Sequence, residues 1–374
     1  MPASAAFTYN LEAMRNMADF LIYGANGYTG SLIAHEAVRR GYRPILAGRN
    51  AVALAGLARK LELEQRVFAL DNPAAVIAGL RGVRAVLHCA GPFAHTSKPM
   101  ADGCLRVSVH YLDITGEVEV FESLAARGGE AKKAGIMLLP GVGFDVVPSD
   151  CLAAHLKRRL PSALRLALGF QSHSRISRGT VTTIVENLHG GGLVRRDGVL
   201  TNVPAVWKTR EIDFGTGPVK AMTIPWGDLS TAYHSTGIPN IEVYMAAPLG
   251  TRLAVRASRY LGWVLGSSFV QGRLKRRIQA GPPGPTDEER ARGKTFLWGE
   301  ATDDAGQQVV SRLRGPEGYT LTVLAALAVI DRVVTSGAPP GFQTPSTAYG
   351  PDFVLGLEGV IREDEASQVT KRKG

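Results

Sequence analysis

The sequence predicts an α/β protein in which an N-terminal, doubly wound parallel sheet is joined to an α+β domain built on a mixed or antiparallel sheet. Two observations favour this fold. Strand and helix patterns alternate regularly up to residue 148, and a glycine-rich turn joins the first strand to the first helix. Beyond residue 148 the strand patterns continue, but long loops separate them.

The glycine-rich turn, residues 24–30 (GANGYTG), follows a strand predicted at 19–25 and precedes a helix predicted at 31–41. In a Rossmann-type unit three such glycines allow a tight turn, close approach to a pyrophosphate and close packing of helix on sheet. The helix N-terminus then faces the phosphate. The context therefore predicts a dinucleotide site. Its first contacts are expected from Gly24, Asn26, Gly27, Tyr28, Thr29 and Gly30.

The second predicted strand, residues 43–48, ends at Arg49. An NAD-binding chain usually places an acid here, where it holds the 2′-hydroxyl of the ribose. An arginine suits a 2′-phosphate instead, so the sequence predicts NADP(H) as the cofactor. The alternative is a structural glycine turn followed by a solvent-exposed arginine.

Further elements follow in alternation. The predicted helices are 51–61, 73–80, 97–107, 118–134 and 149–160, and the predicted strands are 65–71, 84–90, 111–114 and 136–140. Ligands of open parallel sheets bind beyond the carboxyl ends of the strands. Cofactor contacts are therefore also expected from Asp71, Ala90, Gly91, Pro92, Phe93 and Asp113. Asp145, in the loop after the sixth strand, is a candidate catalytic residue, although an acid in such a loop can equally cap a helix.

The second domain carries strand patterns at 164–172, 219–224, 241–247, 296–302 and 309–314, and a strongly apolar helix at 321–334. Residues 230–237 form a predicted loop rich in hydroxyl groups. Within it, Tyr233 or His234 could stabilise a developing oxyanion or supply a proton. A purely structural polar loop is the alternative.

Five segments are expected. They are a leader at 1–17, a Rossmann NADP-binding domain at 18–160, a substrate or dimer domain at 161–315, a helical segment at 316–361 that packs back on the first domain, and a mobile tail at 362–374.

Composition narrows the class of protein. No signal peptide and no apolar run of about 20 residues is evident, so a cytoplasmic protein is expected. The three cysteines are isolated in the sequence and match no metal-ligand spacing, so no metal site is expected. No nucleic-acid partner is expected either.

The net charge of +10 is concentrated in residues 251–286, which contain seven basic side chains and no acid. A basic amphipathic helix of this kind can lie on an anionic membrane surface or dock an acidic acyl carrier protein. The alternative is an interdomain or homodimer-contact helix with solvated arginines.

Several segments, in order, resemble the saccharopine dehydrogenase-like reductases. They are GANGYTG, the strand end LAGR at 46–49, CAGPF, YLDITGE and PGVGFDVVPSD. The later segments STAYHSTGIPNIEVYMAAP and GPEGYTLTVLAAL look like the trans-acting enoyl reductases of actinobacteria. The resemblance extends from residue 19 to about residue 362. It implies an N-terminal NADP-binding crevice, an inserted α+β domain and a C-terminal helix that returns to the first domain.

The resemblance also implies an activity, an NADPH-dependent reduction of the C=C bond of an α,β-unsaturated acyl thioester or related lipid intermediate. The acyl group would come from a carrier protein or polyketide synthase. Two rivals remain open. One is an imine- or ketone-reducing dehydrogenase, and the other is a non-enzymatic NADP-binding protein at a lipid surface.

Overall fold

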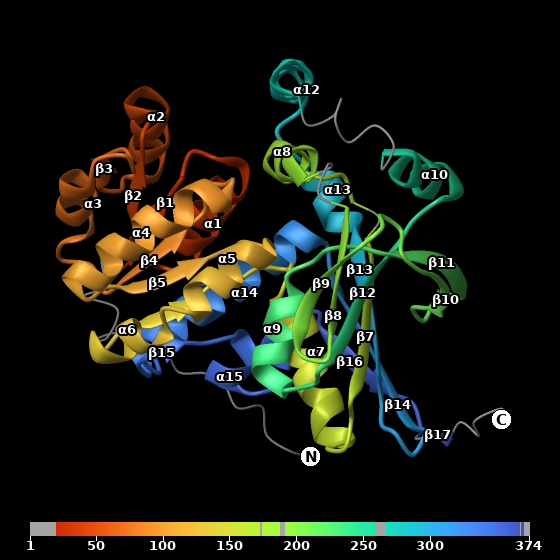
Figure 1. Cartoon of the computed structure of the whole chain (residues 1–374). Helices are drawn as coiled ribbons and strands as arrows, with labels where there is room; N and C mark the ends of the chain where they lie inside the picture. The colour runs from red at the N-terminus through yellow and green to blue at the C-terminus, as the bar shows by residue number, and fades with distance from the viewer. Residues whose placement is uncertain (1–19, 173, 188–190, 259–266, 367, 370–374) are drawn as a thin grey trace, which may run out of the picture.

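The computed structural model describes residues 20–172, 174–187, 191–258, 267–366 and 368–369. It contains two sheets, each with its own helices, that lie side by side (Figure 1). The predicted leader, residues 1–17, lies outside the described residues.

The first sheet is wholly parallel and runs in the order β15-β6-β5-β4-β1-β2-β3. Its strands are β1 (Phe20–Tyr23), β2 (Ile45–Gly48), β3 (Gln65–Val67), β4 (Ala85–His88), β5 (His110–Asp113), β6 (Met137–Leu139) and β15 (Gly341–Phe342). Every residue of β1, β2 and β4 is buried, as expected for parallel strands covered on both faces. The predicted doubly wound sheet is confirmed, with β15 as an unpredicted edge strand.

The helices of this domain are α1 (Tyr28–Arg39), α2 (Ala51–Leu61), α3 (Pro73–Leu80), α4 (Phe93–Val107), α5 (Val118–Ala125) and α6 (Gly128–Lys133). The single helix predicted at 118–134 is wrong. It is two helices, and the second begins at Gly128-Gly129, a pair with poor helix propensity.

The C-terminal helix α14 (Gly318–Thr335) packs against α1 of the first domain, and it also contacts α13 and β14 of the second domain. By length and composition alone α14 could cross a membrane, but half of its apolar window is buried inside the protein. Its contacts are those of a core helix.

The second sheet is mixed and runs in the order β10-β11-β12-β7-β13-β14-β16. Its strands are β7 (Arg165–Ser172), β8 (Gly192–Arg196), β9 (Val199–Val203), β10 (Thr209–Asp213), β11 (Pro218–Thr223), β12 (Asn240–Ala246), β13 (Lys294–Thr302), β14 (Gln307–Pro316), β16 (Ile361–Asp364) and β17 (Gln368–Val369). Only β7 and β12 pair in parallel, and the other pairs are antiparallel.

The helices of the second domain are α7 (Val147–Arg159), α8 (Arg178–Asn187), α9 (Asp228–Thr236), α10 (Leu249–Ser258), α12 (Ser268–Ala280), α13 (Asp287–Arg292) and α15 (Pro345–Tyr349). A short 3-10 turn, η2 (Phe353–Gly356), follows α15. The predicted boundary at residue 160 is wrong, because α7 packs on β13 and β14 of the second sheet. Gly299 of β13 makes room for it: a Cβ there would lie 2.6 Å from Leu156.

Two other predictions are corrected. Residues 230–237 are not a loop, because residues 228–236 form α9. The tail is not free from residue 362, because β16 pairs with β14 and the Asp364 carboxylate accepts hydrogen bonds from Ser311 and, at 2.9 Å, from the His155 ring.

Arg195 of β8 ties the two domains together. This side chain is buried, and it donates hydrogen bonds to the carbonyls of Leu229 and Gly198 and to the carboxylate of Glu122 on α5, 2.5 Å away. Its guanidinium also lies 4.2 Å from the centre of the Tyr233 ring. One cation thus satisfies groups from both domains.

We expect Arg195→Met to lower the free energy of unfolding by about 2 kcal/mol, because it leaves a carboxylate and two carbonyls without their donor. Urea unfolding of both proteins measures the change. Arg196→Met on the same strand is the matched control, since Arg196 is exposed and only stacks on Trp207. An equal loss in both variants would contradict this role.

Candidate cofactor site and active site

The glycine turn has a backbone that side chains would block. Gly24 has φ +81°, and a Cβ there would lie 2.8 Å from that of Ala90, at the end of β4. A Cβ on Gly30 would lie 2.4 Å from the carbonyl oxygen of Gly24. The predicted turn therefore needs glycine at these positions for close packing. Asn26 and Gly27 are exposed, so the backbone of this part of the turn forms an open cradle.

Helix α1 begins directly after this cradle, with Gly27 as its N-cap and no acid in its first turn. The first N–H groups of a helix lack partners within it and carry partial positive charge. The turn and the helix together fit the pyrophosphate of a dinucleotide.

Tyr28 does not point its side chain toward a ligand, although it belongs to the predicted motif. Its hydroxyl donates to the carbonyl of Pro285, 2.6 Å away, and accepts from Arg290 at 3.0 Å. Its ring meets Tyr319 edge to face. Tyr28 therefore fastens the glycine turn to the second domain. Sequence spacing gives no signal for this contact, because 257 positions separate Tyr28 from Pro285.

Arg49 and Asp71, after β2 and β3, are both exposed at the adjacent edge of the sheet. Both act on Tyr23: burial raises the pKa of the Tyr23 phenol, Arg49 lowers it, and Asp71 raises it. The next residue, Asn50, caps α2 with its side chain, so Arg49 is the cationic side chain at the end of β2. The position suits a phosphate on an adenosine ribose.

The loop after β4 packs on the glycine turn through Ala90. Gly91 is exposed there, whereas Phe93 is buried. The Glu117 carboxylate caps α4 by accepting from the N–H groups of Phe93 and Ala94, at 2.9 and 2.7 Å. Thus Glu117, which lies in the loop after β5, holds the loop after β4 in place.

Asp113 braces two neighbouring loops. Its buried carboxylate accepts hydrogen bonds from the N–H groups of Thr115 and Gly141, both at 2.9 Å, and from the Tyr111 hydroxyl at 2.6 Å. Burial raises its pKa to about 6, against these hydrogen bonds. These hydrogen bonds hold the Asp113 carboxylate within the protein, so they do not indicate the predicted direct contact with the cofactor. Asp113 shapes the loops after β5 and β6 instead.

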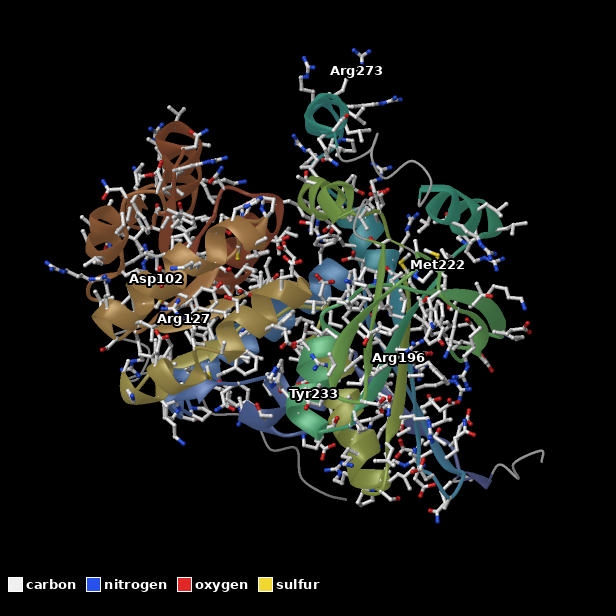
Figure 2. The ribbon with its side chains drawn as sticks, in the orientation of Figure 1. Asp102, Arg127, Arg196, Met222, Tyr233 and Arg273 are labelled. Atoms are coloured by element: carbon white, nitrogen blue, oxygen red, sulfur yellow. The ribbon has the colours of Figure 1, made fainter. Side chains whose placement is uncertain are left out.

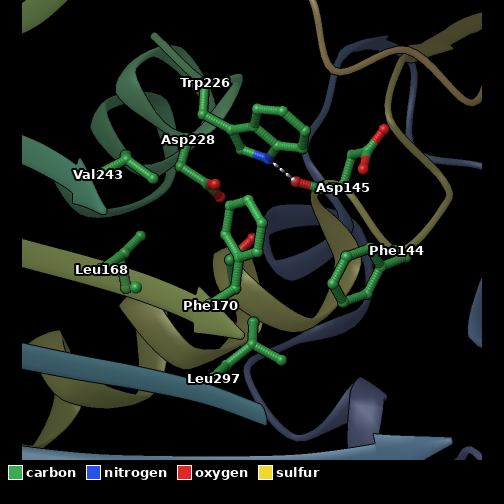
Figure 3. Close-up of a pocket in the computed structure, with 10 residues that line it drawn as sticks. Phe144, Asp145, Leu168, Phe170, Trp226, Asp228, Val243 and Leu297 are labelled. Carbon is green, nitrogen blue, oxygen red and sulfur yellow. Dashed lines mark hydrogen bonds between the residues drawn. The ribbon is translucent and has the colours of Figure 1, made fainter. Parts of the chain in front are cut away.

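Asp145, after β6, borders an aromatic cavity between the two domains (Figure 3). The Trp226 indole donates to the Asp145 carbonyl at 3.0 Å, and Phe170 lies between Trp226 and Phe144. Figure 3 shows the Asp145 carboxylate on the far side of this contact from Asp228. A Cβ on Gly116 would lie 3.2 Å from that carboxylate, so it faces the loop after β5. Burial raises the pKa of Asp145 to about 7.

Two more acids are buried near Asp145: Asp228 lines the cavity itself, and Asp150 lies on α7. Asp228 begins α9, is 1% exposed, and has one carboxylate oxygen without a partner among the described residues. Burial raises the pKa of Asp228 well above its usual range. The charges of Asp150 and Asp145 raise this pKa further, whereas a hydrogen bond with Ser149 lowers it. Burial raises the pKa of Asp150 as well. No group of three or more His, Cys, Asp or Glu side chains in the described part of the chain is arranged to hold a metal ion.

Tyr233 and His234 lie apart from the residues that line the cavity. Tyr233 stacks on Arg195, and His234 meets Phe342 edge to face and lies 3.8 Å from Glu122. Burial lowers the pKa of His234. These contacts favour a role at the domain interface, and their predicted part in catalysis has no support from the geometry.

A larger groove of about 770 Å³ lies elsewhere on the second domain. Its lining includes Gln171, Phe296, Arg175 and Lys294, and no residue of the first sheet. The small cavity, unlike this groove, is lined by Asp145 of the loop after β6, at the carboxyl edge of the NADP-binding sheet. The small cavity beside Asp145 is therefore the candidate active site.

Comparison with known proteins supports the cofactor assignment of the first domain. Residues 20–139 match the saccharopine dehydrogenase NADP binding domain. Residues 20–139 are therefore similar to the NADP-binding domain of the saccharopine dehydrogenase family. The cofactor-binding domain of the chain is thus of the NADP-binding type, and the predicted cofactor and recognition are confirmed at the level of the family.

Curated proteins that are similar to this chain are named as oxidoreductases or reductases. A probable mitochondrial saccharopine dehydrogenase-like oxidoreductase of Arabidopsis thaliana is 27% identical over 42% of this chain and 40% of its own. A trans-acting enoyl reductase of Mycobacterium ulcerans is 26% identical over 67% of this chain and 63% of its own. The chain therefore spans less than two thirds of the length of these relatives.

Solved structures show the same fold. Saccharopine dehydrogenase (L-Glu forming) from Saccharomyces cerevisiae aligns over 93% of this chain and 99% of its own, with a TM-score of 0.60 and 12% identity. A homospermidine synthase of Legionella pneumophila in complex with NAD aligns over 92% of this chain and 91% of its own, with a TM-score of 0.61 and 10% identity.

We expect NADPH to bind this protein more tightly than NADH, and Arg49→Ala to weaken NADPH binding by roughly ten- to a hundredfold while sparing NADH. The physical reason is one charge-assisted contact with the 2′-phosphate. Calorimetric titration of both cofactors measures it, with exposed Lys60→Ala as control. An unchanged preference in Arg49→Ala would contradict the assignment.

We expect Asp228 to make folding stability depend on pH. Its folded pKa is raised above the unfolded value of about 3.9, so the wild type loses stability as pH rises above about 4. Asp228→Asn should therefore lose less in thermal midpoint between pH 5 and pH 8 than the wild type. The exposed Asp304→Asn serves as control. Parallel curves for Asp228→Asn and the wild type would disprove the claim.

Proposed function

We propose that the protein is an NADPH-dependent reductase of a polarised double bond, the C=C bond of an α,β-unsaturated acyl substrate, with Asp145 as the proton donor. One observation carries the proposal. Asp145, which borders the aromatic cavity, carries a carboxyl group with its pKa raised to about 7, and this group faces the loop after β5 at the carboxyl edge of the NADP-binding sheet.

The residues of the chain would divide the work as follows. The cradle at Gly24, Gly27 and Gly30 and the cation of Arg49 would hold the cofactor, and the loops braced by Asp113 would shape the crevice beside it. When bound, NADPH supplies the hydride for the β-carbon. Protonated Asp145 would give its proton to the α-carbon, so that hydride and proton together add one H₂ across the bond. A proton from water then restores Asp145.

The walls of the cavity suit an apolar substrate. Phe144, Phe170, Trp226, Leu168 and Leu297 line it, so an acyl chain would meet aromatic and aliphatic surface. The cavity measures only about 10 Å³, which is room for roughly one water. Substrate entry therefore requires the aromatic side chains, or the domains that carry them, to move apart.

The relatives add support, since the trans-acting enoyl reductase of Mycobacterium ulcerans aligns with two thirds of this chain. The oxidoreductases named for saccharopine dehydrogenase support a hydride-transfer enzyme more generally. A protein that binds NADP(H) without turnover would have no need of a carboxyl group poised to donate a proton at neutral pH.

A second candidate function has an observation in its favour. The aromatic rings that line the cavity attract a cation, so the same cavity could receive a protonated imine. Assays of NADPH oxidation with crotonyl-CoA and with a cyclic imine separate the two. Turnover of the thioester alone supports the enoyl substrate, and turnover of the imine alone supports the second candidate.

We expect kcat/KM to fall about tenfold per pH unit above pH 7, because the proton donor is then ionised. Asp145→Asn should lower kcat by roughly a hundredfold or more and leave a flat profile over this range. Steady-state rates across the pH range with the better substrate measure both effects.

The control is Asp304→Asn, whose profile should match that of the wild type. NADPH affinity of Asp145→Asn should also be unchanged. A normal rate in Asp145→Asn, or a falling limb that survives the substitution, would assign the proton to another group.

A further inference from the structure

Helices α10 and α12 stand at one end of the second domain, beyond the end of its sheet (Figure 1). The two helices flank an intervening segment that lies outside the described residues. α12 packs on α8, and Arg273 of α12 points away from the rest of the molecule (Figure 2). Neither helix contributes a residue to the cavity beside Asp145.

α10 exposes a pair of leucines. Leu249 is 62% exposed and Leu253 is 57% exposed, and their spacing of four residues places them on one face of the helix. Arg252 and Arg256 lie one turn apart on the same helix. Exposed leucines beside arginines cost solvation free energy unless a surface covers them.

The charged residues of α10 and α12 are all basic. Residues 251–286 contain no acid, and exposed cations on α10 and α12 include Arg256, Arg273, Arg276 and Arg277. None of these four forms an ion pair with the residues that the structure describes. Arginines elsewhere in the chain commonly find carboxylates, as Arg158 and Arg362 do with Asp352. The α10 and α12 cations are therefore available for an external anion.

We propose that the exposed surface of α10 and α12 docks on an anionic lipid bilayer. The leucines of α10 would enter the boundary between headgroups and acyl chains, and the arginines of both helices would lie against lipid phosphates. Two separate helices carry the cations, so the charge is spread broadly. A laterally extended surface matches this spread better than one acidic helix of a carrier protein does.

The expected affinity can be bounded from the charges. Each basic side chain near an anionic surface contributes roughly a fivefold increase in partitioning. Removal of four arginines should thus reduce binding by more than about a hundredfold at low ionic strength. Salt should act in the same direction, because the Debye length falls from ~10 Å at 0.1 M to ~3 Å at 1 M.

The experiment is co-sedimentation of the full chain, without cofactor, with vesicles of phosphatidylcholine alone or mixed with phosphatidylglycerol. The test variant changes Arg256, Arg273, Arg276 and Arg277 to Gln. A matched control removes four exposed cations from the first domain, by changing Arg59, Lys60, Lys132 and Lys133 to Gln. Both variants have the same net charge. A third variant, Leu249→Ser with Leu253→Ser, tests the apolar part, and circular dichroism checks that each variant folds.

We expect the wild type and the control to sediment with anionic vesicles at low salt, and the test variant to stay in solution. The leucine variant should bind at least tenfold more weakly. No binding by the wild type, equal binding by the test variant, or equal loss in the control would overturn the proposal. So would binding to an acidic acyl carrier protein but not to vesicles. The readout requires no turnover, so its failure leaves the proposed reductase function untouched.

Discussion

The close backbone packing at the glycine turn is the constraint on which the rest of the structure depends. Gly30 at the start of α1 approaches the carbonyl of Gly24, and Gly24 approaches Ala90 after β4, at distances that no side chain allows. This fixes α1 over the centre of the parallel sheet and turns its N-terminus toward the crevice. Since α14 packs on α1 and Tyr28 reaches Pro285, the same packing also places the second domain. The position of the cavity follows from it.

Buried acids then shape the crevice, and each has a different use. Asp113 is surrounded by donors and braces two loops, whereas Asp145 lies between the domains with a pKa near neutrality. Asp228 is buried with an oxygen left unpaired. A carboxyl group in such surroundings costs stability, and perturbed acids in clefts are common at functional sites. The raised pKa of the proposed proton donor and the loss of stability thus have one physical origin, the removal of carboxyl groups from water.

Much of the fold could be predicted from local sequence, because the glycine turn, Arg49 and the regular alternation of strands and helices are local signals. The limits come from interactions across long separations. The edge strands β15 and β16 are short and pair with strands far away in the chain. The sequence of α7 resembles that of a further helix of the first domain, and only the contact of its leucines with Gly299 shows that it packs on the second sheet. At the site, Tyr233 and His234 attracted attention by residue type, whereas Arg195 and Glu122, which determine their surroundings, carry no such signal. Asp145 was recognisable only because it follows a strand of the parallel sheet.

The most direct test is a crystal structure with NADPH bound. The proposed arrangement predicts the pyrophosphate against residues 24–30, the 2′-phosphate at Arg49, and the nicotinamide beside Gly116 with the Asp145 carboxyl within reach of the space over its C4 atom. A nicotinamide that lies away from Asp145, with the aromatic cavity closed off from it, would contradict the central claim that the two domains build one reduction site between them.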